Sequence, residues 1–375
     1  MRVAIRGYKI LDDIKEILNL DEIQIVCVVD LNSDLWGKLI DNIQIISPMK
    51  AFKYFMRHEI DKIIVNPLIG IQKITDIVNE MQKMGISYEY IRVPKVEDVF
   101  EKHKICSQEL ISTKYSVENF KNLYYLEYHI ADDCNLNCAG CSHFSPLVQK
   151  KYYPSLESTR RDMNRLKEII DHIEWIRILG GEPFLNENWK GYIEIIRHCW
   201  KYSKLSIVTN GLLLKKLTDE DFYFLKNNNV WIDISLYKPL WNYIDDILIM
   251  LNAKDVKYEI NGAPIFEFTS VFDINSKDDF VKKRTMCTAP CNNLYKGKMS
   301  PCPIMMYTSI FNDYFNTDLP EGQPVDLYDD LDYEKLCHQL KKPMKICQYC
   351  NMEEKKPWKQ VNKNNCKIED WIVRN

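Results

Sequence analysis

Three cysteines stand within eight residues in the stretch CNLNCAGC, which runs from Cys134 to Cys141. The first twenty residues carry acidic side chains and no A-x-A cleavage site, so we expect no signal peptide and a cytoplasmic protein. In a reducing compartment, metal or cluster ligation explains clustered thiols better than disulfides do, and the chain has 13 cysteines. A zinc site, a redox pair, an iron–sulfur cluster and unligated buried thiols are the alternatives for this loop.

The composition limits the classes of partner. Hydrophobic residues make up 46% of the 375 residues, enough for a large core in two or three domains. The formal net charge of -3 argues against a broad phosphate-binding surface, so no nucleic-acid partner is expected. No apolar run approaches the ~18 residues needed to span a membrane.

Residues 1–90 alternate the patterns of strands and helices. Short apolar segments predict strands at 1–5, 23–30 and 61–67, and helical spacing predicts helices at 10–20, 51–58 and 71–85. The last helix is expected to end at Gly85. This alternation predicts a Rossmann-like, doubly wound domain over residues 1–110. Asp30 stands where dinucleotide folds hold a ribose, but one glycine, Gly7, replaces the expected G-x-G-x-x-G, so another ligand or a partner role is favoured.

A second alternating series begins at Tyr124, after a mixed-charge stretch at 91–122 that we interpret as a connector. The series predicts a partial (β/α)6 barrel over residues 120–275. Active sites on such sheets lie at the carboxyl ends of the strands. The marked loops there are 134–141, 180–183, 209–211 and Ser235. Regular structure is expected to thin out from Cys287, so residues 276–375 are predicted to form a small module held together by ligands.

The first cysteine loop supplies three thiolates at tight spacing. Structural zinc takes four ligands, and His143, two residues beyond Cys141, keeps zinc open on ligand count. We favour His143 as a polar loop residue. Three cysteines on a four-iron cluster would leave one iron open to bind a substrate.

This C-x3-C-x2-C pattern after the first predicted barrel strand, together with Gly-Gly-Glu-Pro at 180–183, resembles the radical S-adenosylmethionine (SAM) superfamily. The resemblance covers residues 124–350. It implies that a 4Fe–4S cluster that binds SAM is held by Cys134, Cys138 and Cys141. It further implies SAM contacts from Gly180, Gly181, Glu182, Thr209, Asn210 and Ser235. Glycines let a ligand approach the backbone, and a carboxylate suits the ammonium group of the methionine moiety.

One position departs from the superfamily pattern. The residue before the third cysteine is often aromatic and packs near adenine, whereas here it is Gly140, with Phe144 a few residues on. The adenine contact is therefore unassigned by the sequence.

A second cysteine set lies near the end of the chain and consists of Cys291, Cys302, Cys347 and Cys350. It resembles the short twitch domain, a reduced form of the SPASM domain, which implies an auxiliary 4Fe–4S cluster suited to electron transfer. Cys287 is the alternative to Cys291, which we favour. A zinc ribbon is the other interpretation of this set, and Cys337 and Cys366 are left over.

The resemblance implies that a flavodoxin- or ferredoxin-type donor reduces the first cluster and that SAM then yields a 5′-deoxyadenosyl radical, which abstracts hydrogen. The stretch GCSHFSPL at 140–147, with the N-terminal domain, resembles proteins of surface-glycan assembly. We therefore expect oxidation or epimerisation of a small-molecule or nucleotide-linked sugar. A maturase of a ribosomally made peptide is the alternative, and a non-enzymatic redox scaffold is disfavoured by Gly-Gly-Glu-Pro. No side chain is singled out as the catalytic hydrogen donor.

Overall fold

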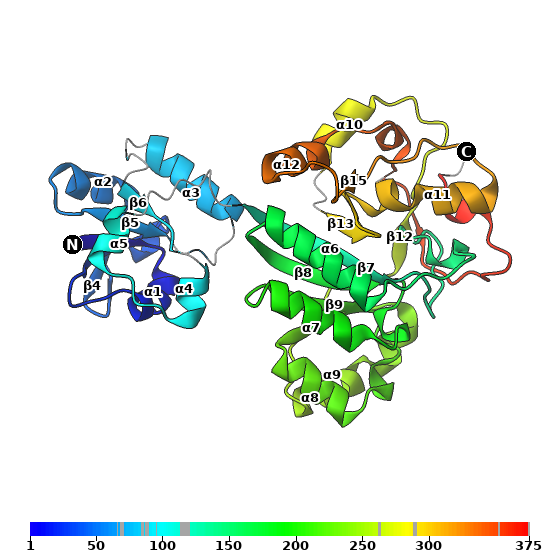
Figure 1. Cartoon of the computed structure of the whole chain (residues 1–375), viewed down its shortest axis with the longest axis horizontal. Coiled ribbons are helices and arrows are strands. Elements are labelled where there is room, and N and C mark those ends of the chain that lie inside the picture. Colours follow the sequence, from blue (N-terminus) through cyan, green and yellow to red (C-terminus); the bar gives the residue numbers. More distant parts are fainter. Residues whose placement is uncertain are drawn as a thin grey trace. The chain divides into compact units, whose positions relative to one another are not determined.

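The computed structural model describes residues 1–65, 67, 71–83, 86, 90–94, 96–112, 121–261, 264–287, 291–351 and 353–373. The chain forms two compact units, Met1–Tyr124 and Tyr125–Asn375. Each is built from a mixed arrangement of helices and mainly parallel strands (Figure 1). No helix in the described ranges is both long enough and apolar enough to cross a membrane.

The first unit contains a six-stranded sheet in the order β3-β4-β2-β1-β5-β6. Its strands are β1 (Arg2–Arg6), β2 (Gln24–Val29), β3 (Leu39–Ile40), β4 (Ile43–Ile46), β5 (Lys62–Val65) and β6 (Ile91–Arg92). All neighbours pair in parallel except β3 and β4, which are antiparallel. Such sheets bury both faces, which is why the strands are short continuous apolar runs.

Helices cover both faces of this sheet. They are α1 (Leu11–Ile17), α2 (Pro48–Met56), α3 (Ile71–Lys83), α4 (Val96–Glu101) and α5 (Ser107–Ser112). Successive strand residues point to opposite faces, so Ala4 packs with α2 and α3 while Val3 and Ile5 pack with α1 and α5. The Rossmann-like assignment stays a prediction, and Gly85 lies outside the described residues.

Two details of the first unit differ from expectation. The predicted connector at 91–122 contains β6, α4 and α5, because buried Ile105 and Leu110 are interspersed among its charges and join the core. Asp30 is occupied by its own chain, since its carboxylate accepts hydrogen bonds from the backbone N–H groups of Tyr8 (3.3 Å) and Asn32 (2.9 Å).

The second unit is organised around an eight-stranded sheet in the order β11-β10-β9-β8-β7-β13-β14-β15. Its strands are β7 (Asn122–Ala131), β8 (His172–Gly180), β9 (Lys204–Thr209), β10 (Val230–Ile234), β11 (Tyr258–Ile260), β13 (Asn293–Tyr295), β14 (Lys298–Ser300) and β15 (Val325–Asp326). Strands β8 to β11 pair in parallel, β13 pairs in parallel with β7, and β13, β14 and β15 are antiparallel. The carboxyl ends of β8 to β11 therefore meet at one edge.

The helices that connect these strands are α6 (Leu156–Ile169), α7 (Trp189–Cys199), α8 (Asp219–Asn227) and α9 (Ile244–Ala253). Figure 1 shows α6 and α7 side by side on one face of the sheet. Ser155 caps α6 by accepting from the Ser158 N–H, and Thr218 and Asp221 form a capping box at α8. The described residues thus contain five successive strands with four helices between them, and the (β/α)6 count stays a prediction.

The expectation that regular structure thins out after Cys287 is wrong. The described residues after Met286 include α11 (Pro303–Phe315) and α12 (Tyr333–Lys341), and α10 (Phe280–Met286) precedes them. Phe311 of α11 packs with Phe144, Phe272 and Trp371 in one apolar cluster, so a core supports this region besides any ligands. A separate antiparallel ribbon joins β12 (Glu267–Thr269) to β16 (Lys355–Pro357).

Candidate functional site

The loop that follows β7 brings its three cysteines to one cavity. Cys134, Cys138 and Cys141 all line a cavity of about 370 Å³, which we call the first cavity. The cavity is also lined by the ends of β8, β9 and β10, by β12 and by Trp358. The three thiols predicted to act together are therefore brought together.

Burial shifts the acid–base balance of these thiols. It raises the pKa of Cys134 to about 12 and also raises the pKa of Cys138 and of Cys141. A thiol must lose its proton to become a metal ligand, so the site favours thiolates only when a positively charged group accompanies them. Three soft thiolates in one protected cavity are a donor set that suits iron–sulfur ligation.

Two glycines let the end of β8 lie directly against the chain that leads into the cysteine loop. A Cβ atom at Gly180 would stand 2.3 Å from the Ala131 carbonyl oxygen, and one at Gly181 would stand 2.1 Å from that of Asp133. The Gly181 N–H donates to the Ala131 carbonyl at 2.6 Å. Both glycines line the first cavity, so this close approach forms part of its wall.

Glu182 follows the two glycines, and its carboxyl group lies inside the protein. Its side chain is 0% exposed and is not among the described residues that line the first cavity. It accepts hydrogen bonds from the Thr209 hydroxyl (2.8 Å) and the Asn210 N–H (3.0 Å), and burial raises its pKa to about 7. The carboxyl group therefore orders the end of β9, and its contact with the methionine moiety stays a prediction.

The remaining predicted SAM-contact residues face the cavity. Thr209, Asn210 and Ser235 line it together with the two glycines. The Asn210 side-chain amide donates to Asn135 Oδ1 at 2.7 Å and lies 3.7 Å from Cys134 Sγ. Glu182 thus acts on the cysteine loop through Asn210.

The space beside Gly140 is filled by a ring from another element. Gly140 has φ +63°, and a Cβ atom there would stand 2.0 Å from Cδ2 of Phe268 in β12. Phe268 lines the first cavity, whereas Phe144 is fully buried and packs against Phe272 and Phe311. Sequence reasoning missed Phe268. Glycine at position 140 indicated that no side chain of this residue fills the space beside it, but nothing in the sequence indicated which ring would occupy that space.

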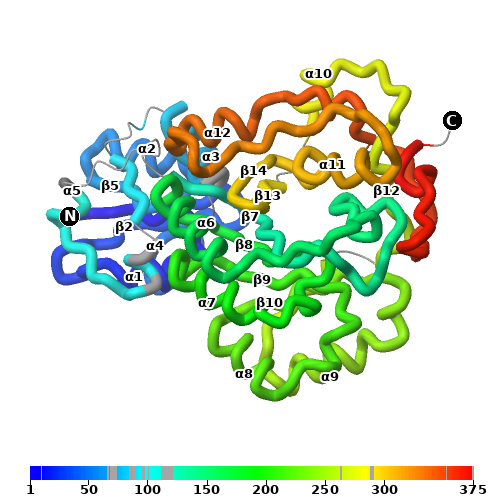
Figure 2. The backbone as a smooth tube through the Cα atoms, turned by 45° about the vertical axis from the view of Figure 1, so that its right-hand side comes forward, coloured from blue at the N-terminus to red at the C-terminus, as the bar shows by residue number. Residues whose placement is uncertain are grey.

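A C-terminal segment, residues 355–373, covers the cysteine loop. The Ala139 N–H donates to the Lys359 carbonyl (3.0 Å), and the Val361 N–H donates to the Asn137 carbonyl (2.8 Å). The indole of Trp371 donates to the Cys141 carbonyl at 3.1 Å. Figure 2 shows this segment in red, next to β12. Backbone pairing therefore fixes one side of the loop.

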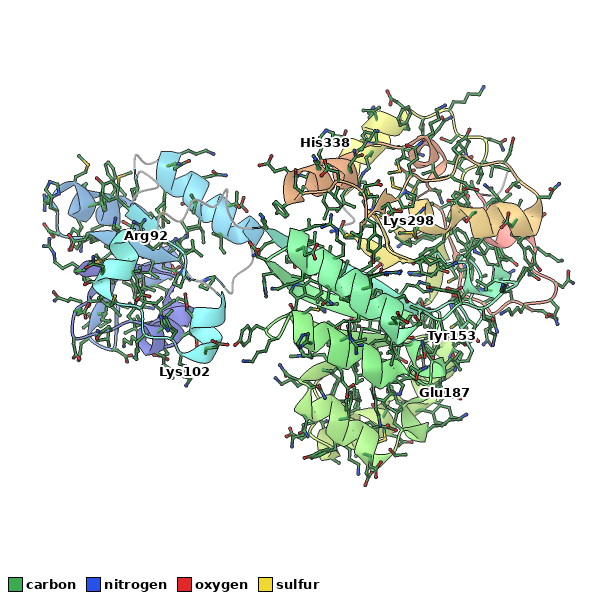
Figure 3. All side chains as sticks on the ribbon, in the orientation of Figure 1. Arg92, Lys102, Tyr153, Glu187, Lys298 and His338 are labelled. Carbon is green, nitrogen blue, oxygen red and sulfur yellow. The ribbon has the colours of Figure 1, made fainter. Side chains whose placement is uncertain are left out.

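Two aspartates fix the chain just before the loop. Asp132 accepts from the Tyr152 N–H (3.0 Å) and from the Tyr295 hydroxyl (3.1 Å to each oxygen). Asp133 accepts from the hydroxyl of Tyr153, the tyrosine labelled in Figure 3, and pairs with Lys151. These contacts leave the carboxylates engaged with protein groups next to Cys134.

Polar side chains of the sheet form one part of the first cavity, which we call the polar floor. Glu127 of β7 and Arg177 of β8 line it. The Tyr125 hydroxyl donates to Glu127 (2.6 Å) and accepts from Arg177 (2.8 Å), while Arg177 also pairs with Asp233 of β10. Burial raises the pKa of Glu127. This polar floor can hydrogen-bond a hydroxyl-bearing or amine-bearing molecule.

His143, expected to be a polar loop residue, lines the same cavity and packs among aromatic rings. Its ring lies 5.5 Å from that of His129 and 5.4 Å from that of Tyr307. Burial lowers its pKa to about 3, so the imidazole is neutral at physiological pH. Among the described residues its Nε2 atom has no hydrogen-bond partner.

The second cysteine set gathers around another cavity of about 370 Å³, the second cavity, which Cys287, Cys302, Cys347 and Cys350 line. Cys291, the residue favoured from the sequence, is not among the lining residues described. It precedes β13, near enough to Glu127 for that charge to affect its pKa, which burial raises to about 12. Spacing along the chain could not distinguish the two cysteines, because both lie within reach of the other three in sequence terms.

Two further cysteines lie away from both cavities. Cys337 and Cys366 do not appear among the described residues that line either cavity. Within the described ranges no three or more His, Cys, Asp or Glu side chains stand close enough to hold one metal ion.

Residues 128–240 match the model of a protein family described as the radical SAM superfamily. A GTP 3',8-cyclase of Mannheimia succiniciproducens is 31% identical over 109 residues, 28% of this chain and 32% of the relative. The S-adenosylmethionine-dependent nucleotide dehydratase RSAD2 of Siniperca chuatsi is 30% identical over 103 residues, 27% of this chain and 28% of the relative. The chain therefore spans about a third of the length of these curated relatives.

Among solved structures, BtrN in complex with AdoMet and 2-DOIA aligns with 62% of this chain and 94% of its own, at 14% identity and a TM-score of 0.39. That likeness is too low to bear on the reaction. The matched segment contains Cys134, Cys138, Cys141 and the Gly180–Pro183 turn. Residues 128–240 of this chain are a radical SAM superfamily domain.

Proposed function

We propose that the chain is a radical SAM enzyme that uses a 4Fe–4S cluster on Cys134, Cys138 and Cys141. The observation that carries this proposal is the meeting of all three thiols with the ends of β8, β9 and β10 in one cavity. When bound, the cluster and SAM would supply a 5′-deoxyadenosyl radical able to abstract hydrogen from an unactivated carbon.

The chain's own residues would position the reactants and keep water away. Gly180 and Gly181 offer backbone atoms at the cavity wall, and Asn210 lies between the cysteine loop and β9. The β12–β16 ribbon places Phe268 and Trp358 at the same cavity. Phe268 is our candidate for the adenine contact that Gly140 cannot make. Fixed positioning in a water-excluded site is the main contribution a protein can make to such a reaction.

We propose a sugar, free or nucleotide-linked, as the substrate, oxidised or epimerised at a carbon that faces the cluster. The polar floor made by Glu127 and Arg177 supports this choice, because a polyhydroxylated molecule needs buried donors and acceptors. The curated relatives include enzymes named for GTP and for nucleotides, which agrees with a nucleotide-linked form. As part of the same proposal, residues 1–110 form a Rossmann-like domain that binds such a substrate.

We also propose an auxiliary 4Fe–4S cluster on Cys287, Cys302, Cys347 and Cys350, with Cys287 replacing Cys291. Their shared cavity supports this set. Cys302 is the N-cap residue of α11, where the helix dipole favours a thiolate. Iron and sulfide content should fall by about half in Cys287→Ala and stay at the parent's level in Cys291→Ala. The reverse result would restore Cys291 as the ligand.

The decisive experiment is an anaerobic assay of the reconstituted protein for 5′-deoxyadenosine, with reduced flavodoxin or dithionite as electron source. The parent should cleave SAM, and variants with Ala at Cys134, Cys138 or Cys141 should not. Absence of cleavage by a cluster-loaded parent would exclude the radical reaction. Deuterated sugars and a ribosomal-type peptide, compared for deuterium transfer into 5′-deoxyadenosine, would then distinguish the sugar substrate from peptide maturation.

A further inference from the structure

Two cysteines of the loop receive N–H groups from different places. Cys134 Sγ accepts from the Leu136 backbone N–H at 3.4 Å, within its own loop, and from the Asn210 side-chain amide at 3.7 Å. Cys138 Sγ accepts from the indole Nε1–H of Trp358 at 3.3 Å, although 220 residues separate the two along the chain. The donor to Cys138 therefore exists only when the C-terminal segment is in place.

The indole is held where it is by several independent contacts. Trp358 follows β16 directly, and its backbone N–H donates to the Phe266 carbonyl at 2.8 Å. Its ring lies 5.8 Å from that of Tyr237, and both rings line the first cavity. The contact is thus part of an ordered wall rather than a chance approach of an exposed side chain.

An N–H group directed at a cluster thiolate changes the energy of electron uptake. Reduction adds negative charge that is shared with the sulfur ligands, and a hydrogen bond to sulfur stabilises the more negative state. Removal of such a donor makes the cluster harder to reduce, so its midpoint potential falls. Local donors within the loop would stay in place.

We infer that Trp358 is a positioning residue that raises the reduction potential of the cluster on Cys134, Cys138 and Cys141 through its N–H···S bond to Cys138. The inference rests on the proposed function, since it needs that cluster. It assigns to the C-terminal segment a part in electron entry, in addition to its contacts with the loop backbone.

The test is a redox titration of the cluster, monitored by electron paramagnetic resonance. The signal to titrate is the one that changes when SAM is added, because that signal belongs to the SAM-binding cluster. Trp358→Phe keeps a ring and loses the N–H. We expect its reduction equilibrium constant to fall about tenfold, a shift of about 59 mV for one electron. Gln360→Leu is the matched control, because Gln360 lies in the same segment and donates to the Leu136 carbonyl (2.9 Å) instead of to sulfur. Its potential should equal that of the parent.

The outcomes separate this inference from the proposed function. A parent protein that takes up no iron and sulfide would contradict the proposed function. A loaded Trp358→Phe variant with the parent's potential, or an equal shift in Gln360→Leu, would overturn the role of Trp358 alone. If Trp358→Phe does not take up iron and sulfide, the parent protein labelled with nitrogen-15 in its tryptophan indoles tests the N–H···S bond instead. Electron–nuclear double resonance should detect nitrogen-15 coupled to the reduced cluster, and its absence would overturn the inference.

Discussion

Glu182 is a carboxyl group removed from water whose partners are a hydroxyl and backbone N–H groups. Burial penalises its charged form more than the contacts from Asn210, Thr209 and Phe184 favour it, so its pKa rises from 4.5 to about 7. The proton it retains near neutrality belongs to the folded state, which links the stability of this unit to pH.

The sign of that linkage can be worked out. Between about pH 4.5 and pH 7 the folded state binds more protons at Glu182 than the unfolded state does, so stability falls as pH rises. Relative to Glu182→Gln, the metal-free parent should lose about 3 kcal/mol of unfolding free energy across this window, at about 1.4 kcal/mol per pKa unit. Urea denaturation of both proteins at several pH values measures the difference. A difference that does not vary with pH would contradict the raised pKa.

Two separate features of position 140 require glycine, namely its positive φ and the nearby ring of Phe268. A side chain there would meet backbone strain of about 1–2 kcal/mol from the positive φ and an overpacking cost of about 1–3 kcal/mol against Phe268. Gly140→Ala should therefore destabilise the protein more than Gly297→Ala, whose φ is +72° and whose nearest neighbour would be 3.1 Å away. In a Phe268→Ala background the overpacking part should vanish, which a double-mutant cycle measures. Additive effects would show that the ring is not the obstacle.

At the scale of residues, the sequence indicated which residue types form the site, but it did not indicate which way each side chain points. The cysteine spacing predicted three thiols in one loop. The glycines at 180 and 181 predicted room for a ligand at the backbone, and the structure shows that the backbone of Ala131 and Asp133 also lies close to them. The sequence does not say which way the side chains of Glu182 and Cys291 point, because a carboxylate beside a cavity can face the ligand or the protein, and two cysteines four residues apart can face opposite sides. The direction of Glu182 follows from its hydrogen bonds to the end of β9, which join residues 27 and 28 positions apart in the chain.

At the scale of elements, the cysteine loop is bounded by β7 on one side and by the C-terminal segment on the other. Trp371 anchors that segment, since it is 0% exposed and its carbonyl accepts from the backbone N–H groups of Val271 (2.8 Å) and Phe272 (3.0 Å). Helical and strand periodicity predicted most elements up to residue 239. It missed α11, whose buried residues share one face and include Thr308 and Asn312, while the apolar residues Met306 and Ile310 lie outside that face, so no clean apolar stripe stands out.

Loss of the Trp371 anchor should loosen a loop far away in sequence. Trp371→Ala should lower the unfolding free energy by about 3–5 kcal/mol, the usual cost of emptying a buried aromatic site. Hydrogen exchange at residues 134–141 should speed up in this variant. Tyr223→Ala, at a side chain that is 69% exposed on α8 of the same unit, should change neither quantity. Unchanged exchange in the cysteine loop would mean that β7 alone holds it.

At the scale of the whole molecule, the chain consists of two units with separate cores. The first unit has two apolar clusters of its own, one on each face of its sheet, and the second has another around Phe272, Phe311 and Trp371. The alternation of strands and helices predicted a boundary between 110 and 120, close to the division after Tyr124. The long-range pairing of 355–373 with the cysteine loop has no local signature and could not be predicted.

Separate cores predict that each unit folds alone. A fragment of residues 1–112 should unfold cooperatively in urea, and a fragment of residues 121–375 should take up the same iron and sulfide per chain as the full protein. Tryptophan fluorescence and iron analysis of the two fragments measure these properties. Failure of the second fragment to load, while it stays folded, would show that the first unit takes part in cluster binding.

The pairing between the cysteine loop and the C-terminal segment sets an order of events during synthesis. The ribosome makes Cys138 long before it makes Trp358, 220 residues later. Throughout that interval the nascent chain presents three thiols without the wall that shelters them. Oxygen and competing zinc can reach the loop during that interval, so we expect the proposed cluster to be inserted after translation of the last strand.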